Sequence, residues 1–131
     1  MAVGLATGAW MFAEYALGLH DSPTGAGRWT GILALVFPAL GAWRVGARSG
    51  LRSWSEAGRE GLLFGCVGGA VGAAAIWLYF AVVNPGFSVG GRTVAAGPQA
   101  AAGFVGALVL GTLLTLAAFA VARRKPAPPC P

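Results

Sequence analysis

Two long apolar runs in the second half of the chain constrain its fold more than any other feature. Residues 61–83 and 100–122 contain no Asp, Glu, Lys or Arg. A helix needs about 20 residues to cross the hydrocarbon core of a bilayer, and each run is long enough. Only 10% of all residues are charged and 56% are hydrophobic, whereas a soluble domain is about 25% charged. Too few charges remain to cover a water-facing surface, so the chain is predicted to be an integral membrane protein.

Two further apolar segments, residues 2–19 and 29–45, complete a set of four predicted spans. Pro38 interrupts the segment at residues 29–45 and is expected to kink its helix, which membrane helices tolerate. Glu14 interrupts the segment at residues 2–19, and no Lys or Arg precedes the apolar part of this segment. We therefore interpret the first segment as a retained helix and not as a cleaved signal peptide. The predicted fold class is all-α: an integral membrane four-helix bundle.

Basic residues are distributed unevenly between the connecting segments. The loop at residues 44–60 carries four arginines, residues 123–125 carry three basic side chains, and the two other loops carry one arginine each. Positively charged loops stay in the cytoplasm, so the central loop and both termini are predicted to be cytoplasmic. The chain then consists of a four-span domain, residues 1–122, and a basic, proline-rich cytoplasmic tail, residues 123–131.

The third span has recognisable start and stop signals. Ser53 and Glu56 have the spacing of a capping box, in which each side chain accepts the backbone N–H of the other residue. At the far end Asn84 can close the helix, Pro85 cannot continue it, and Gly86 permits a turn. A ligand contact by Asn84 is the alternative interpretation. Four aromatic residues near span ends are predicted to lie at the membrane interfaces: Trp29, Trp43, Trp77 and Tyr79.

Small residues recur every four positions in the third and fourth spans. Helices in lipid associate by close packing, which small residues permit. We therefore expect the third helix to pack closely on the fourth, and an intermolecular face is the alternative use of the same pattern. Gly4 and Gly8 form a shorter row in the first span. The predicted packing residues are Gly61, Gly65, Gly69, Gly68, Gly72, Gly103, Ala107 and Gly111.

The order of these features resembles a bacterial membrane protein family of unknown function, number forty-one ninety-nine in the usual numbering of such families. The similarity rests on the basic loop, on "SWSEAGREGLLFG" and on the "NPGF" exit, and covers mainly Arg44 to Phe87. It implies a four-helix, multi-pass protein of the bacterial inner membrane. The family has no assigned activity, so the resemblance implies no function. This chain is richer in Gly and Ala and has a proline-rich tail.

The inventory of reactive side chains is small. One His and four acidic residues are present, and no His lies within a predicted span. No pair has metal-ligand spacing on a helix face, so no catalytic residue, metal or cofactor is predicted. The net charge of +5 is placed beside the spans, which favours lipid head groups over nucleic acid. Arg123, Arg124 and Lys125 are the predicted anchor to lipid or to a partner.

Glu14 is the candidate intramembrane polar site, because ionisable groups within spans are often functional. One interpretation is a structural pairing near the outer surface with His20, Arg28 or Arg92. The other is an ion or proton relay. Few other polar side chains lie at membrane depth in the first and fourth spans, namely Thr7, Thr112 and Thr115.

Two function classes follow. The first is a non-catalytic accessory or structural subunit, packed by its small-residue helix faces within a larger membrane complex or a homo-oligomer. A bioenergetic assembly, photosynthetic or respiratory, is a suitable setting. The second is a small oligomeric carrier or channel with Glu14 in the pathway.

Overall fold

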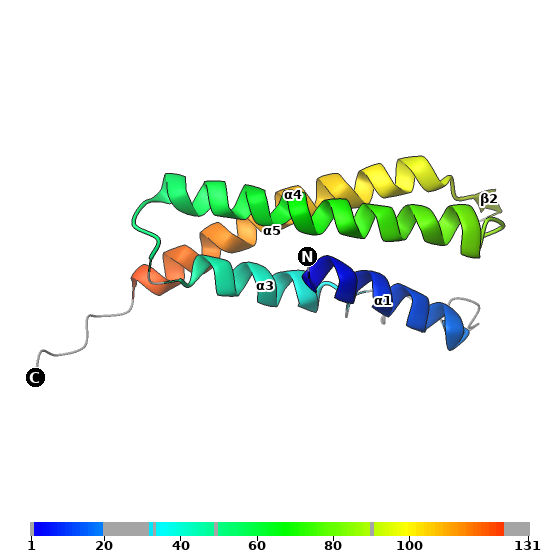
Figure 1. The fold of residues 1–131 in the computed structure, drawn as a ribbon, viewed down its shortest axis with the longest axis horizontal. Helices are drawn as coiled ribbons and strands as arrows, with labels where there is room; N and C mark the ends of the chain where they lie inside the picture. Colours follow the sequence, from blue (N-terminus) through cyan, green and yellow to red (C-terminus); the bar gives the residue numbers. More distant parts are fainter. Residues whose placement is uncertain (1, 20–31, 33, 49, 90, 125–131) are drawn as a thin grey trace, which may run out of the picture.

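The computed structural model describes residues 2–19, 32, 34–48, 50–89 and 91–124 (Figure 1). The described residues form four α-helices, a π-helical segment and one short antiparallel hairpin. The predicted all-α class is confirmed, and the tail beyond Arg124 lies outside the described residues. The elements are α1 (Ala2–Ala16), α3 (Val36–Gly46), α4 (Trp54–Leu78), η2 (Tyr79–Val83), β1 (Ser88–Val89), β2 (Arg92–Thr93) and α5 (Ala96–Arg123).

Two helices of the described chain are long and apolar enough to cross a membrane. They are Trp54–Val83, which joins α4 to η2, and Ala96–Arg123, which is α5. Only 11% and 22% of their most apolar windows are buried inside the protein. The core helix of a soluble protein would be mostly buried, so this outward-facing apolar surface supports a membrane location.

The same conclusion follows from the exposed side chains. Large apolar residues face outward along the full length of the molecule, which is unfavourable in water and favourable in lipid. Those that are about half exposed or more include Leu5, Leu40, Trp43, Leu63, Trp77, Val82, Val105, Val109 and Leu113.

Helices α1 and α3 are shorter, and they share one side of the α4–α5 pair. They contain 15 and 11 residues, or about 22 Å and 16 Å at a rise of about 1.5 Å per residue. In Figure 1, α3 lies toward the start of α4 and α1 lies toward the hairpin. Helix α1 runs parallel to α4, because Gly4 lies beside Gly68 and Tyr15 lies beside Tyr79. Each short helix therefore covers about half of the long pair.

Proline decides where two of these helices begin. Helix α3 starts at Val36, so Pro38 lies in its first turn, where a missing N–H breaks no helical hydrogen bond. We expected Pro38 to kink a longer helix, but α3 begins only two residues before it. Residues 29–31 and 33 of the predicted span lie outside the described residues. In the same way α5 begins at Ala96 and contains Pro98 in its first turn.

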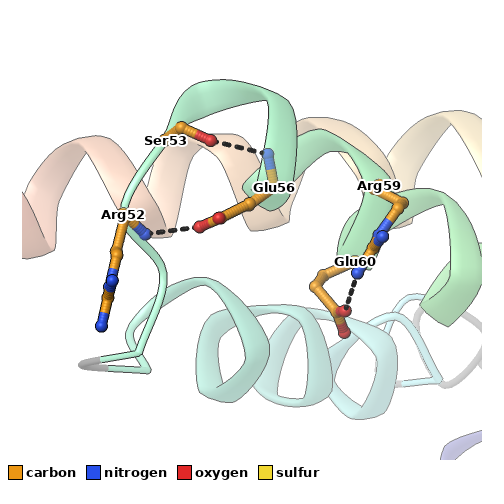
Figure 2. A network of polar contacts seen from close by, with 5 residues as sticks. All are labelled: Arg52, Ser53, Glu56, Arg59 and Glu60. Carbon is orange, nitrogen blue, oxygen red and sulfur yellow. Dashed lines mark hydrogen bonds and ion pairs between the residues drawn. The ribbon is translucent and has the colours of Figure 1, made fainter.

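The predicted start of α4 at Ser53 is confirmed. The Ser53 hydroxyl accepts a hydrogen bond from the Glu56 backbone N–H at 3.1 Å (Figure 2). The Glu56 carboxylate reaches back one residue further than a capping box requires, and accepts the backbone N–H of Arg52 at 2.7 Å. Both bonds satisfy donors at the entrance of the helix, so α4 begins well before the apolar run that it contains.

The far end of α4 closes through a π-helical turn. The Asn84 backbone N–H donates to the Tyr79 carbonyl at 2.8 Å, a bond across five residues. The Phe87 N–H then donates to the Asn84 carbonyl at 3.2 Å, and this turn contains Pro85. The hairpin of β1 and β2 follows and leads directly into α5.

Candidate functional site

The first glycine row of α4 lies against the backbone of α5. Gly61, Gly65 and Gly69 are buried. A Cβ atom added at Gly61 would lie 3.0 Å from the Cα of Thr112, and one added at Gly65 would lie 2.8 Å from the Cα of Leu108. These distances leave no space for a methyl group, so glycine allows the two helix backbones to touch.

The small residues of α5 face the same contact. A Cβ added at Gly111 would lie 3.2 Å from the Cα of Gly65. The Cβ of Ala107 would lie 3.1 Å from one added at Gly69, and Gly103 lies against Ile76. The structure thus brings both rows into one continuous, antiparallel helix interface.

Glycines also allow the two short helices to pack closely on the long pair. A Cβ added at Gly4 would lie 2.7 Å from the Gly68 carbonyl oxygen, and one added at Gly8 would lie 2.8 Å from the Cβ of Ala75. At the last residue of α3, Gly46 lies directly against the Thr115 carbonyl of α5. Each helix therefore meets the long pair through a position that tolerates no side chain.

The second glycine row of α4 has different surroundings. A Cβ added at Gly68 or Gly72 would meet no atom of the described residues within 4 Å, and the same is true of Gly106 on α5. These three glycines line a hollow of about 300 Å³, which we call the glycine groove. Val3 of α1 and Leu35, just before α3, lie along its border. Of the two rows predicted on this helix, Gly61, Gly65 and Gly69 lie against α5, while Gly68 and Gly72 have free space above them; Gly65 and Gly69 also border the hollow.

Glu14 is buried at the hairpin end of α1. Its side chain is 5% exposed, and its Oε1 accepts a hydrogen bond from the Trp10 indole N–H at 2.9 Å. Of the partners expected from the sequence, His20 and Arg28 lie outside the described residues, and Arg92 lies exposed on β2. Trp10 lies one helical turn before Glu14, so this hydrogen bond joins neighbouring turns of α1.

Tyr79 differs from the expectation for an interfacial aromatic, because it is completely buried. Its ring makes edge contacts with Phe12, Tyr15 and Phe80 at centroid distances of 6.0, 5.6 and 5.0 Å. The Asn84 side-chain amide donates a hydrogen bond to the Tyr79 hydroxyl at 3.4 Å, so the Asn84 side chain contacts a residue of the protein core. No pattern in the sequence marks Tyr79 as a core residue, since its burial depends on the position of α1.

A π-helical turn beginning at a buried tyrosine is a feature that sequence reasoning missed. Such turns are rare and frequently occur at functional sites. Glu14 precedes Tyr15, which contacts Tyr79, so the buried carboxylate lies at the same level of the bundle as the π-helical turn. The hairpin end of the molecule thus contains the buried carboxylate, the Tyr79 hydroxyl and the π-helical turn.

The threonines of the spans use their hydroxyl groups within their own helices. Thr7 donates to the Val3 carbonyl at 3.0 Å, and Thr112 donates to the Leu108 carbonyl at 2.7 Å. Thr115 donates to the carbonyl four residues earlier at 2.8 Å. Each hydroxyl hydrogen is thereby satisfied without a bound ion or water.

The predicted anchor at the end of α5 is described only in part. The Arg123 guanidinium lies 5.2 Å from the centre of the Phe119 ring, a cation–π contact. Arg124 is exposed at the helix end, and Lys125 lies outside the described residues.

Comparisons with known proteins leave these sites to be interpreted from their own geometry. No protein family model, no curated protein and no solved structure matches this chain.

The filled glycine row generates a stability prediction. Gly65→Leu inserts a side chain where a Cβ alone would lie 2.8 Å from the α5 backbone. We expect it to lower the free energy of unfolding by about 1–3 kcal/mol or more, as overpacking does. Val67→Leu adds volume on the same helix at a position that is 47% exposed, and serves as the control. Thermal unfolding in detergent, followed by circular dichroism, measures both. Equal midpoints for the two variants would contradict close packing at Gly65.

Proposed function

We propose that this chain is a non-catalytic integral membrane protein, an accessory subunit that receives a helix of a neighbouring subunit in its glycine groove. The neighbour is a membrane helix of a larger complex or of a second copy of this chain. The observation that carries the proposal is the open row formed by Gly68, Gly72 and Gly106. Small residues spaced by four permit close helix association in lipid. Gly4 of α1 lies against the Gly68 carbonyl, but a Cβ added at any of the three glycines would meet no atom of the described residues within 4 Å.

The location of the groove supports this proposal. It lies along the middle of α4, within the apolar run that starts at Gly61. Its floor is backbone and its borders are apolar, so it offers shape and van der Waals contact to an apolar helix. The Thr7 hydroxyl at its border already donates to the Val3 carbonyl. These are the properties of a packing surface.

The proposed arrangement in the membrane is a four-helix bundle with the basic end in the cytoplasm. Arg44 lies in the last turn of α3, and Arg48 and Arg52 follow this helix. Arg123 and Arg124 lie at the end of α5, and Arg48 and Arg123 line the same hollow. Because positive charge is retained on the cytoplasmic side, the hairpin between β1 and β2 would face the opposite compartment. The end of α5 would then be cytoplasmic in a bacterial inner membrane, whereas α1 starts beside the middle of α4, where Gly4 lies against Gly68 (Figure 1).

This orientation predicts which introduced cysteines react from outside the cell. In a chain with Cys66 and Cys130 replaced by serine, Ser55→Cys marks the basic end and Thr93→Cys marks the hairpin, and both positions are exposed. We expect a membrane-impermeant maleimide to label Thr93→Cys in spheroplasts and to label Ser55→Cys only after lysis. The reverse pattern would show that the basic end faces outward.

The groove predicts a specific defect in assembly. A Cβ added at Gly72 would meet no atom of the described residues within 4 Å, so we expect Gly72→Leu to retain the fold while its side chain occupies the groove and excludes the neighbour. Ala70→Leu places the same side chain on an exposed position of α4 outside the groove lining and is the matched control. We expect Gly72→Leu to migrate as the isolated chain in native gels of solubilised membranes, while Ala70→Leu and the wild type remain in a larger particle.

Two further measurements make that experiment decisive. Circular dichroism establishes that both variants retain their helices. Energy transfer between labelled copies in liposomes distinguishes a second copy of this chain from a different subunit. If all three proteins migrate identically in folded form, the groove is not an assembly surface.

The burial of Glu14 favours a second candidate, a small carrier or channel with this carboxylate in its pathway. Its prediction is that the chain alone transports protons or cations in liposomes, and that Glu14→Gln, which retains an acceptor for the Trp10 indole, abolishes this flux. Trp77→Phe, a change at an exposed position, is the control. Absence of flux by the wild-type chain would exclude this candidate. The internally bonded threonines favour the first proposal.

A further inference from the structure

A second hollow lies at the basic end of the molecule, between the end of α3 and the end of α5. It encloses about 340 Å³. Two arginines from distant parts of the sequence line it, Arg48 just after α3 and Arg123 in the last turn of α5. The remaining lining is almost entirely apolar and includes Trp43, Leu51 and Phe119. We call this hollow the basic pocket.

The pocket exists because α3 and α5 approach closely one turn before it. Gly46 lies against the Thr115 carbonyl, and a Cβ added there would lie 2.7 Å from the Cβ of Ala118. Beyond this contact α3 ends at Gly46 while α5 continues to Arg123. The chain that follows α3, including Ala47 and Leu51, then forms the opposite wall.

The floor of the pocket is rigid and orients one of its arginines. Phe119 is 2% exposed and makes an edge contact with the Trp54 ring at a centroid distance of 5.2 Å. The Arg123 guanidinium lies over the Phe119 ring at 5.2 Å from its centre. A cation–π contact limits the conformations of this long side chain, so less entropy is lost when it binds an anion.

The positive charge at the pocket is not neutralised by the described chain. No carboxylate among the described residues forms an ion pair with Arg48 or Arg123. Glu60 pairs with Arg59 at 3.9 Å, and Glu56 accepts the Arg52 backbone N–H. The pocket therefore combines two available cations with an apolar lining, at the end of helices that face lipid.

We propose that the basic pocket binds one anionic phospholipid. The phosphate group would be held by Arg48 and Arg123, whose guanidinium groups donate several hydrogen bonds to phosphate oxygens. The start of an acyl chain would lie against Leu51 and Phe119, while Trp43, which is 50% exposed, lies at the head-group level. A soluble anion would gain nothing from this apolar lining. Basic pockets between membrane helices on the cytoplasmic side are suited to such lipids.

This inference rests on the proposed membrane location and does not depend on the glycine groove. Its test uses the full chain in detergent and phosphatidylglycerol, measured by native mass spectrometry. The double variant Arg48→Gln, Arg123→Gln removes both cations of the pocket. The control, Arg52→Gln, Arg59→Gln, removes the same charge at the same end from residues outside the pocket lining.

We expect wild type and control to bind one phosphatidylglycerol tightly, and the pocket variant to bind it about 30-fold more weakly, at roughly fivefold per arginine. Phosphatidylcholine with the same chains should bind weakly to all three. Ala122→Phe, which fills the pocket and retains its charge, should also weaken binding. Inorganic phosphate should not displace the lipid.

Three outcomes would overturn the proposal. Equal weakening in both double variants would mean that only total charge matters. Equal binding of the two lipids would remove the phosphate specificity, and displacement by inorganic phosphate would indicate a soluble anion. Circular dichroism of each variant establishes that it is folded, and assembly in native gels is scored separately, so failure of the lipid site is distinguishable from failure of the glycine groove.

Discussion

The backbone contact between α4 and α5 is the interaction on which the rest of the molecule depends. In lipid there is little hydrophobic force to press two apolar helices together, so their association requires many close van der Waals contacts. Gly61, Gly65 and Gly69 supply them by letting the α5 backbone approach to distances that exclude a Cβ. This contact fixes the rotation and register of both long helices. It thereby determines which of their faces remain available to α1, α3 and outside partners.

The two short helices complete the bundle by dividing the length of this pair. Helix α1 packs on the hairpin half of α4 through Gly4 and Gly8, while α3 packs on the basic half of α5 through Gly46. Both border the groove, α1 through Gly4 beside Gly68 and α3 through Pro38, but neither fills the space over Gly72 and Gly106, and each is too short to span the pair. Glycine therefore has two roles here. It lets helices pack closely inside the bundle, and at the groove it leaves an outer surface without side chains.

The two ends of the bundle differ in chemistry. The hairpin end buries a carboxylate, a tyrosine and a π-helical turn within an aromatic cluster. The other end brings Arg48 of the central loop and Arg123 of α5 to the same apolar floor. The Glu14 side chain at the first end is enclosed by the protein, and Arg48 and Arg123 at the second are open to their surroundings. A bilayer, with an apolar core and anionic surfaces, is an environment that accommodates both.

The sequence by itself determined those features that depend on local interactions and on the total apolar length. The all-α class, the helix start at Ser53 and the turn after Asn84 were predictable, because each depends on bonds within a few residues. The sequence predicts that Pro38 interrupts a helix. Whether it kinks that helix or lies at its start depends on how far the helix extends toward the N-terminus.

Only the tertiary structure decided which small residues touch a neighbour and which remain open. Gly65 and Gly68 are similar in sequence context, yet one is buried against α5 and the other faces the glycine groove, because a helix places them on different faces. The burial of Tyr79 and the meeting of Arg48 with Arg123 likewise require the position of a second helix. Sequence periodicity specifies the faces of one helix, but the axial shift and rotation between helices come from packing all of them together.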